Sequence, residues 1–129
     1  MDPWVGDIEQ ETRRNDTFRT VVFTGEHTQL TVMSIAPGDD IGGEVHDGHD
    51  QFIRIESGSA RVELGGTEDS PAKVQEVGDD WAVIIPSGTW HNVVNTGEEP
   101  LKLYSLYSPP EHPDGTVHRT KADAEAAES

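Results

Sequence analysis

The sequence predicts a single all-β domain, built as a barrel or sandwich of short strands. Short runs rich in β-branched and aromatic residues follow one another from Phe18 to about Tyr107. Turn pairs such as Pro37-Gly38 and Gly65-Gly66 separate these runs. No segment before the C-terminal tail repeats apolar residues with a helical period. With 129 residues, the chain can build one core and is too short for two.

Three regions are expected in chain order: an N-terminal arm at 1–17, a β-barrel at 18–108, and a C-terminal loop with a short helix at 109–129. The arm is polar and is expected to pack only through Trp4, Val5 and Ile8. Strands are predicted at residues 19–23, 29–36, 44–46, 51–56, 60–64, 73–77, 81–85, 91–95 and 101–107.

The last strands and the tail carry their own signals. The run 81–85 is apolar at every position, which predicts a central strand buried on both faces. Three prolines after Tyr107 exclude regular ladder pairing there. Residues 120–129 are expected to form a short helix with Thr120 as its N-cap and Asp123 near its positive end.

The composition excludes several function classes. The formal charge is −16, from 25 acidic and 9 basic residues, so nucleic acid and anionic membranes are poor partners. High salt would screen this repulsion, and the sequence therefore favours a salt-adapted host over an ordinary one. The chain has no cysteine, which excludes disulfides and thiol chemistry. Its first ten residues do not resemble a signal peptide, and no apolar run is long enough to span a membrane, so we expect a cytoplasmic protein.

Four residues are predicted to converge on one metal ion. Glu44 and His46 are two positions apart, so both point to the same face of a strand. Residues 47–50 are expected to form a turn that places Gln51 opposite His46, with Ile53 continuing the inward face. His91 follows another turn and also points inward. Polar groups inside a barrel are costly unless they are satisfied, and metal coordination would satisfy them.

These residues carry a resemblance to the cupin family. The first cupin motif, G-x5-H-x-H-x(3,4)-E-x6-G, is matched in spacing from Gly38 to Gly58, with Glu44 at the first histidine position and Gln51 at the glutamate position. The second motif, P-x-G-x2-H-x3-N, is matched outright at 86–95. The resemblance implies a double-stranded β-helix, or jelly-roll, barrel over roughly residues 20–107. It also implies a divalent transition metal, and the mixed nitrogen and oxygen donors suit Mn, Fe, Co, Ni or Zn.

Alternatives remain for individual residues. Gln51 can instead hydrogen-bond the turn, and His49 can replace Glu44 at the metal. His112 and His118 are expected to be exposed, although either can close over the barrel mouth, and Tyr107 is expected to pack in the core.

The resemblance implies an enzyme acting on a small sugar- or carbonyl-type molecule, in the manner of isomerases, epimerases, lyases or dioxygenases. The alternative is a non-catalytic binding or sensing module with a structural metal. No cation is evident on an inward face, which argues against a phosphorylated sugar. The outward aromatic residues Phe52 and Trp90 favour a homodimer.

Overall fold

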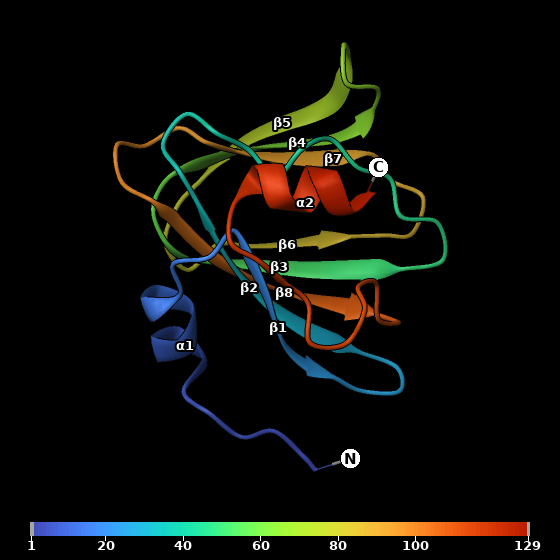
Figure 1. Ribbon diagram of the computed structural model, residues 1–129. Coiled ribbons are helices and arrows are strands. Elements are labelled where there is room, and N and C mark those ends of the chain that lie inside the picture. Colours follow the sequence, from blue (N-terminus) through green and yellow to red (C-terminus); the bar gives the residue numbers. More distant parts are fainter. Residues whose placement is uncertain (1, 129) are drawn as a thin grey trace.

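The strands form two antiparallel sheets that face each other across one core (Figure 1). The structure is a computed structural model that describes residues 2–128, except for the side chain of residue 128. The larger sheet has the order β6 (Ala82–Ile85), β3 (Asp50–Ser57), β8 (Leu101–Ser108), β2 (Gln29–Ile35), β1 (Arg19–Thr24) and β9 (Val117–His118). The smaller sheet has the order β5 (Pro71–Val77), β4 (Ala60–Gly66) and β7 (His91–Asn95). This arrangement confirms the all-β prediction.

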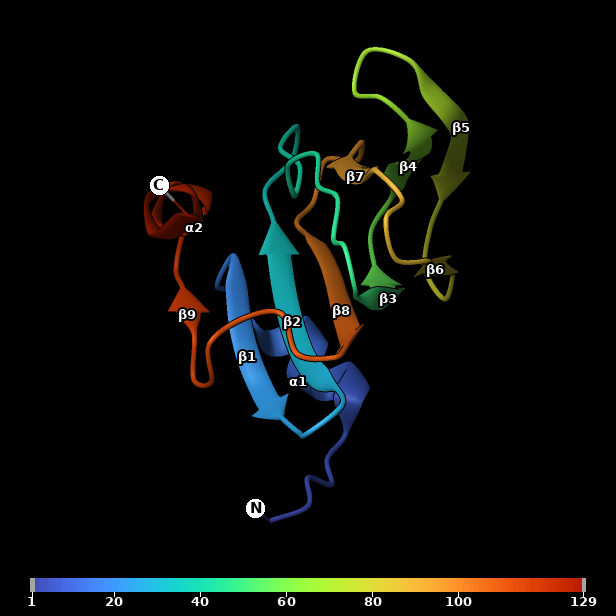
Figure 2. The same ribbon diagram turned by 90° about the vertical axis from the view of Figure 1, so that its right-hand side faces the viewer.

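Two short helices flank the sheets. Helix α1 (Ile8–Arg14) packs on the outer face of the larger sheet, and α2 (Lys121–Glu128) lies beside β9 (Figure 2). The predicted cap of α2 is present: Thr120 Oγ1 accepts the Asp123 N–H, and Asp123 accepts the Thr120 N–H in return. Neither helix is long or apolar enough to cross a membrane, and residues 2–128 contain no other helix.

Helix α1 corrects the expectation of an arm without helical structure. Asp7 caps its first turn by accepting the Gln10 N–H, and Arg13 donates to the carbonyl of Glu56 on β3. With seven residues, the helix is too short to reveal a period in the sequence. Val5 is 94% exposed and does not pack as expected.

Two strand predictions are also wrong. Strand β6 is an edge strand with Ile84 70% exposed, because the sheet ends there and only its inward residues Val83 and Ile85 are covered. Residues 44–46 form no strand of their own, and only Glu44 makes an isolated bridge, to His91. The last residues of the chain also contain the two-residue strand β9, paired with β1, in addition to the expected loop and helix.

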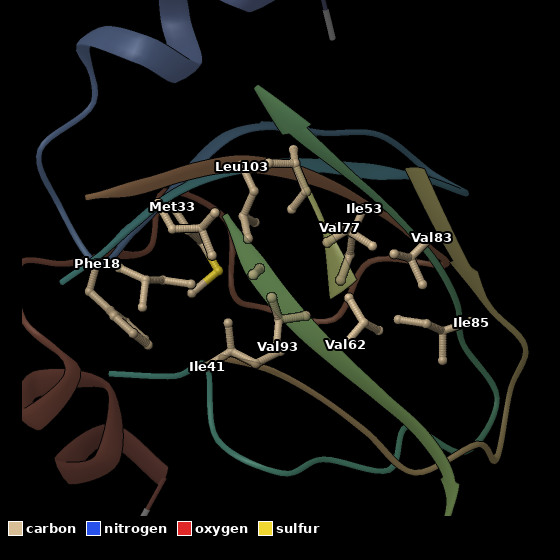
Figure 3. Close-up of a cluster of buried hydrophobic side chains, with 14 of the residues drawn as sticks. Phe18, Met33, Ile41, Ile53, Val62, Val77, Val83, Ile85, Val93 and Leu103 are labelled. Carbon is tan, nitrogen blue, oxygen red and sulfur yellow. The ribbon is translucent and has the colours of Figure 1, made fainter. Parts of the chain in front are cut away.

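The core fills one end of the barrel, and polar residues fill the other. Cross-strand rows on β3, β8 and β2 lie side by side in register. Along the barrel the rows run from Ile55, Leu103 and Met33, through Ile53, Ser105 and Thr31, to Gln51, Tyr107 and Gln29. The apolar rows meet Val62 and Val93 of the smaller sheet in the core (Figure 3). The polar rows therefore mark the end of the barrel where a site can form.

Candidate metal centre

Glu44 and His91 face each other across a pair of main-chain hydrogen bonds. Each N–H donates to the carbonyl of the other residue at 2.9 Å. Opposed residues in an antiparallel pair point their side chains to the same face, here into the barrel. Trp90 covers the neighbouring Gly43 so closely that a Cβ there would lie 2.8 Å from the indole ring. A glycine at this position lets the segment of Glu44 lie flat beside β7.

His46 completes a compact group with these two residues. Its Nε2 donates to Glu44 Oε2 at 2.6 Å, and its ring lies 5.4 Å from the ring of His91. The ligand atoms of Glu44, His46 and His91 all lie within 4.8 Å of one another. Two imidazoles and a carboxylate at this separation could bind one divalent ion.

The orientation of His91 fits a metal ligand. Its Nδ1 lies 3.1 Å from the carbonyl of Thr89, so Nδ1 carries the hydrogen and Nε2 has the free lone pair. His91 is 1% exposed, and its Nε2 has no hydrogen-bond partner. The nearest carboxylate oxygen, on Glu44, is 3.9 Å away and is itself an acceptor. A buried acceptor without a donor costs about 1–3 kcal/mol, which a bound cation would remove.

Gln51 approaches from the facing sheet. It is 3% exposed, and its Nε2 donates to Ser105 Oγ at 3.3 Å. Its Oε1 is buried without a partner, like Nε2 of His91. The amide therefore does not bond the turn, the alternative considered from sequence. Ligation by Gln51 stays a prediction, and its unpartnered oxygen is consistent with it.

The expected hairpin between His46 and Gln51 is wrong. Strand β3 pairs with β6 and β8, so Gln51 lies opposite Ile85 and Tyr107. The turn at 47–50 instead carries the chain from one sheet to the other. It is held against the turn at 86–88, because Gly48 N–H donates to Ser87 Oγ and Ser87 N–H donates to Asp50 Oδ1. The two sequence motifs thus meet through their turns, and the site spans both sheets.

The loop after β8 supplies a residue that sequence reasoning missed. Glu111 lies 3.4 Å from His46 Nδ1 and 3.1 Å from His49 Nε2. His49 is therefore engaged with this loop, while Glu44 lies with the two histidines. Buried Gln29 fixes the loop, since its Oε1 accepts the N–H groups of Glu111 and His112. No sequence pattern links Glu111 to the motifs, because only tertiary contacts bring the loop there.

The protonation of the group follows from its hydrogen bonds and burial. The hydrogen bond to Glu44 raises the pKa of His46 above its usual 6.5. Burial lowers the pKa of His91. Burial alone would raise the pKa of Glu44, but the hydrogen bond from His46 and nearby positive charges lower it below 4.5. Without a metal, His46 holds a proton against the Glu44 carboxylate, and His91 is neutral.

Three further residues line this end. Tyr107 packs edge-on against the rings of His46 and His112, and burial raises the pKa of its hydroxyl. His112 is not exposed as expected, and burial lowers its pKa to about 4. Arg19 is 2% exposed, which corrects the expectation that no cation faces inward. Its alternation with buried Val21 on β1 was the signal available in the sequence.

Two facing antiparallel sheets, with a carboxylate and histidine group at the polar end, define a double-stranded β-helix barrel with a candidate metal site. The chain belongs to the cupin family: the family model described as "Cupin domain" matches residues 31–107. Cupins commonly bind a divalent metal, and this chain has a Glu/His/His group of the matching kind.

Several proteins are similar to this chain over two thirds of its length or nearly all of it. "Uncharacterized protein YrkC" of Bacillus subtilis is 55% identical over 126 residues, which cover 98% of this chain and 68% of that protein. The crystal structure of BH2720 from Bacillus halodurans has a TM-score of 0.95 and 55% identity, covering 97% of this chain and 95% of that one. A predicted oxalate decarboxylase from Thermotoga maritima has a TM-score of 0.58 and 20% identity, covering 66% of this chain and 69% of that one. This last likeness concerns the fold alone.

Proposed function

We propose that this protein is a metal-dependent cupin enzyme that acts on a small polar molecule of sugar or carbonyl type inside its barrel. The observation that carries the proposal is the convergence of Glu44, His46 and His91, whose ligand atoms lie within 4.8 Å of one another. Two buried atoms without partners, His91 Nε2 and Gln51 Oε1, support it further. Buried hydrogen-bond acceptors of this kind are costly in a folded protein unless a ligand satisfies them.

The donor set fits a first-row divalent ion. Two imidazoles, one carboxylate and one amide oxygen would come from Glu44, His46, Gln51 and His91, and such a mixed set suits Mn, Fe, Co, Ni or Zn. When bound, the ion would supply Lewis acidity to a carbonyl or hydroxyl oxygen of the substrate. Four protein ligands would leave coordination positions open on a five- or six-coordinate ion.

The surrounding residues would orient the ligands and limit water. The Thr89 carbonyl fixes the ring of His91, and Glu111 lies beside Nδ1 of His46. Tyr107 keeps its phenolic proton, because burial raises its pKa. His112 stays neutral near pH 7, because its pKa is about 4. These neutral groups make the substrate end of the barrel polar without adding charge.

Metal content and turnover test the proposal. We expect near-stoichiometric first-row metal in the purified protein and little in His91→Ala, because the variant loses a buried ligand. His27→Ala is the matched control, since His27 is exposed and contacts only Glu26. Turnover would be measured for keto-sugars and other carbonyl compounds with each candidate metal. Equal metal in the parent and His91→Ala would contradict the site. Metal binding without turnover of any compound would favour a non-catalytic binding module.

A further inference from the structure

Arg19 is a buried cation that forms no direct ion pair with any described side chain. It opens β1, is 2% exposed, and is among the largest fully buried side chains. None of the ion pairs among the described side chains involves it. An arginine side chain stays charged in proteins, and a buried charge is costly unless it is paired. The Glu44 carboxylate is near enough to feel the charge of Arg19, but it does not form an ion pair with it, so the guanidinium has room for a closer negative group.

The contacts that Arg19 does make leave part of its guanidinium free. Nη1 lies 3.3 Å from His118 Nδ1, the group interacts with the Tyr107 hydroxyl, and it lies 5.4 Å from the ring of Phe18. Nε is buried without any hydrogen-bond partner. The guanidinium therefore has neutral contacts on one side and a donor without a partner on another. Such a guanidinium can still bind an oxyanion through its free donor.

Arg19 and Glu44, one residue of the candidate metal centre, line the same cavity. Its volume is about 90 Å³, and the glycines at 42 and 43 and the α2 residues Lys121, Ala124 and Glu125 also line it. One water needs only about 10–15 Å³ of such space, so the cavity has room for a molecule of a few heavy atoms. Glu44 lines the same cavity that Arg19 lines, so one small ligand could reach both the guanidinium and the metal set.

We propose that this site takes a small carboxylate-bearing molecule, with Arg19 as the residue that binds the carboxylate. The inference rests on the proposed function, because the rest of the ligand would lie toward Glu44, His46 and His91. A guanidinium matches a planar carboxylate with two parallel hydrogen bonds.

The surroundings favour a carboxylate over a phosphate. The other cation at the cavity is Lys121, and its ammonium is already paired with Asp39 and Asp40. One guanidinium suits a single carboxylate, whereas a phosphate dianion usually takes several cations or main-chain N–H groups. The sequence showed no inward-facing cation, and this argued against a phosphorylated substrate. Arg19 supplies one such cation, which suits a carboxylate and not a phosphate.

Calorimetry with the metal-loaded protein tests the assignment. Acetate, glycolate and pyruvate would each be compared with the neutral amide of the same shape, and with inorganic phosphate. We expect each carboxylate to bind at least tenfold more tightly than its amide. This preference should disappear in Arg19→Gln and survive in Arg61→Gln, a control on β4 that pairs with Glu63. Metal content should stay unchanged in both variants.

Three results would overturn the assignment: an unchanged preference in Arg19→Gln, equal binding of carboxylates and amides to the parent, or tighter binding of phosphate than of any carboxylate. If Arg19→Gln does not fold, Arg19→Lys decides. This variant keeps the positive charge but loses the two parallel N–H donors of the guanidinium. We therefore expect at least tenfold weaker carboxylate binding. Unchanged binding would refute the role of Arg19. Normal metal content and turnover without a carboxylate preference would reject this inference alone. An Arg19-dependent carboxylate preference in a protein that binds no metal would reject only the proposed function.

Discussion

Metal binding should release protons near neutral pH, up to one per ion. The hydrogen bond to Glu44 raises the pKa of His46 above 6.5, whereas burial lowers the pKa of His91 below 6.5. Before the metal binds, His46 therefore keeps its proton to higher pH than a free imidazole does, whereas His91 loses its proton at lower pH. A metal takes only neutral imidazole, so His46 must lose its proton and His91 has none to lose.

The size of the effect follows from this count. Below the raised pKa of His46, the apparent metal affinity should rise with pH, by at most about tenfold per pH unit, or about 1.4 kcal/mol, and above that pKa it should level off. The stability of the metal-free protein should change with pH in the opposite direction, falling as the pH rises. The protonated His46 stabilises it fully below pH 6.5 through its pair with Glu44, and this contribution is lost as the pH rises through the folded pKa of His46.

Isothermal titration calorimetry in two buffers of different ionisation enthalpy would count the protons. Glu111→Gln provides a directed perturbation, because the Glu111 carboxylate lies 3.4 Å from His46 Nδ1 and its charge contributes to the raised pKa. The variant should release fewer protons at pH 7. Glu26→Gln is the matched control, since Glu26 lies on the surface beside exposed His27. Release of no proton, with an affinity that does not change from pH 6 to pH 8, would refute the reasoning.

Two further predictions concern Gln51 and the acidic surface. Gln51→Leu should weaken metal binding by about tenfold or more, because it removes the buried Oε1 that has no other partner. Titration calorimetry would check this effect, and an unchanged metal affinity would exclude Gln51 as a ligand. Raising NaCl from 0.1 to 1 M should stabilise the chain by about 1 kcal/mol, or about 4 °C in melting temperature, because screening shortens from about 10 to about 3 Å around a charge of −16. A sucrose control of equal osmolality separates screening from solute exclusion, and a melting temperature that falls with salt would contradict a salt-adapted surface.

The strands and the candidate ligands could be predicted because both depend on local patterns. Alternating apolar residues on β3 and β8 give the inward face directly, and Thr120 gives the start of α2. The motif spacings put Glu44, His46 and His91 on inward positions. The expectations of a homodimer, a cytoplasmic location and a salt-adapted host are not tested by the fold and stay predictions.

The partners of these strands could not be read from the sequence. A turn of four residues between His46 and Gln51 has the length of a hairpin, yet its hydrogen bonds go to Ser87 on another turn, and the chain crosses to the facing sheet. Strand β6 has the composition of a central strand and lies at an edge, because strand order depends on contacts between distant segments.

Side-chain alternation and motif spacing are enough to predict an all-β cupin barrel, the inward positions of its strands, and a histidine and carboxylate set suited to a metal. The sheet to which each ligand belongs, and the residues that surround the site, depend on contacts between segments far apart in the chain. Glu111, His112 and Arg19 lie far from the motifs in sequence. They reach the site through the loop held by Gln29 and through the position of β1 in the larger sheet. The alternation on β1 can show that Arg19 points inward, but no local pattern shows that these three residues lie at the site.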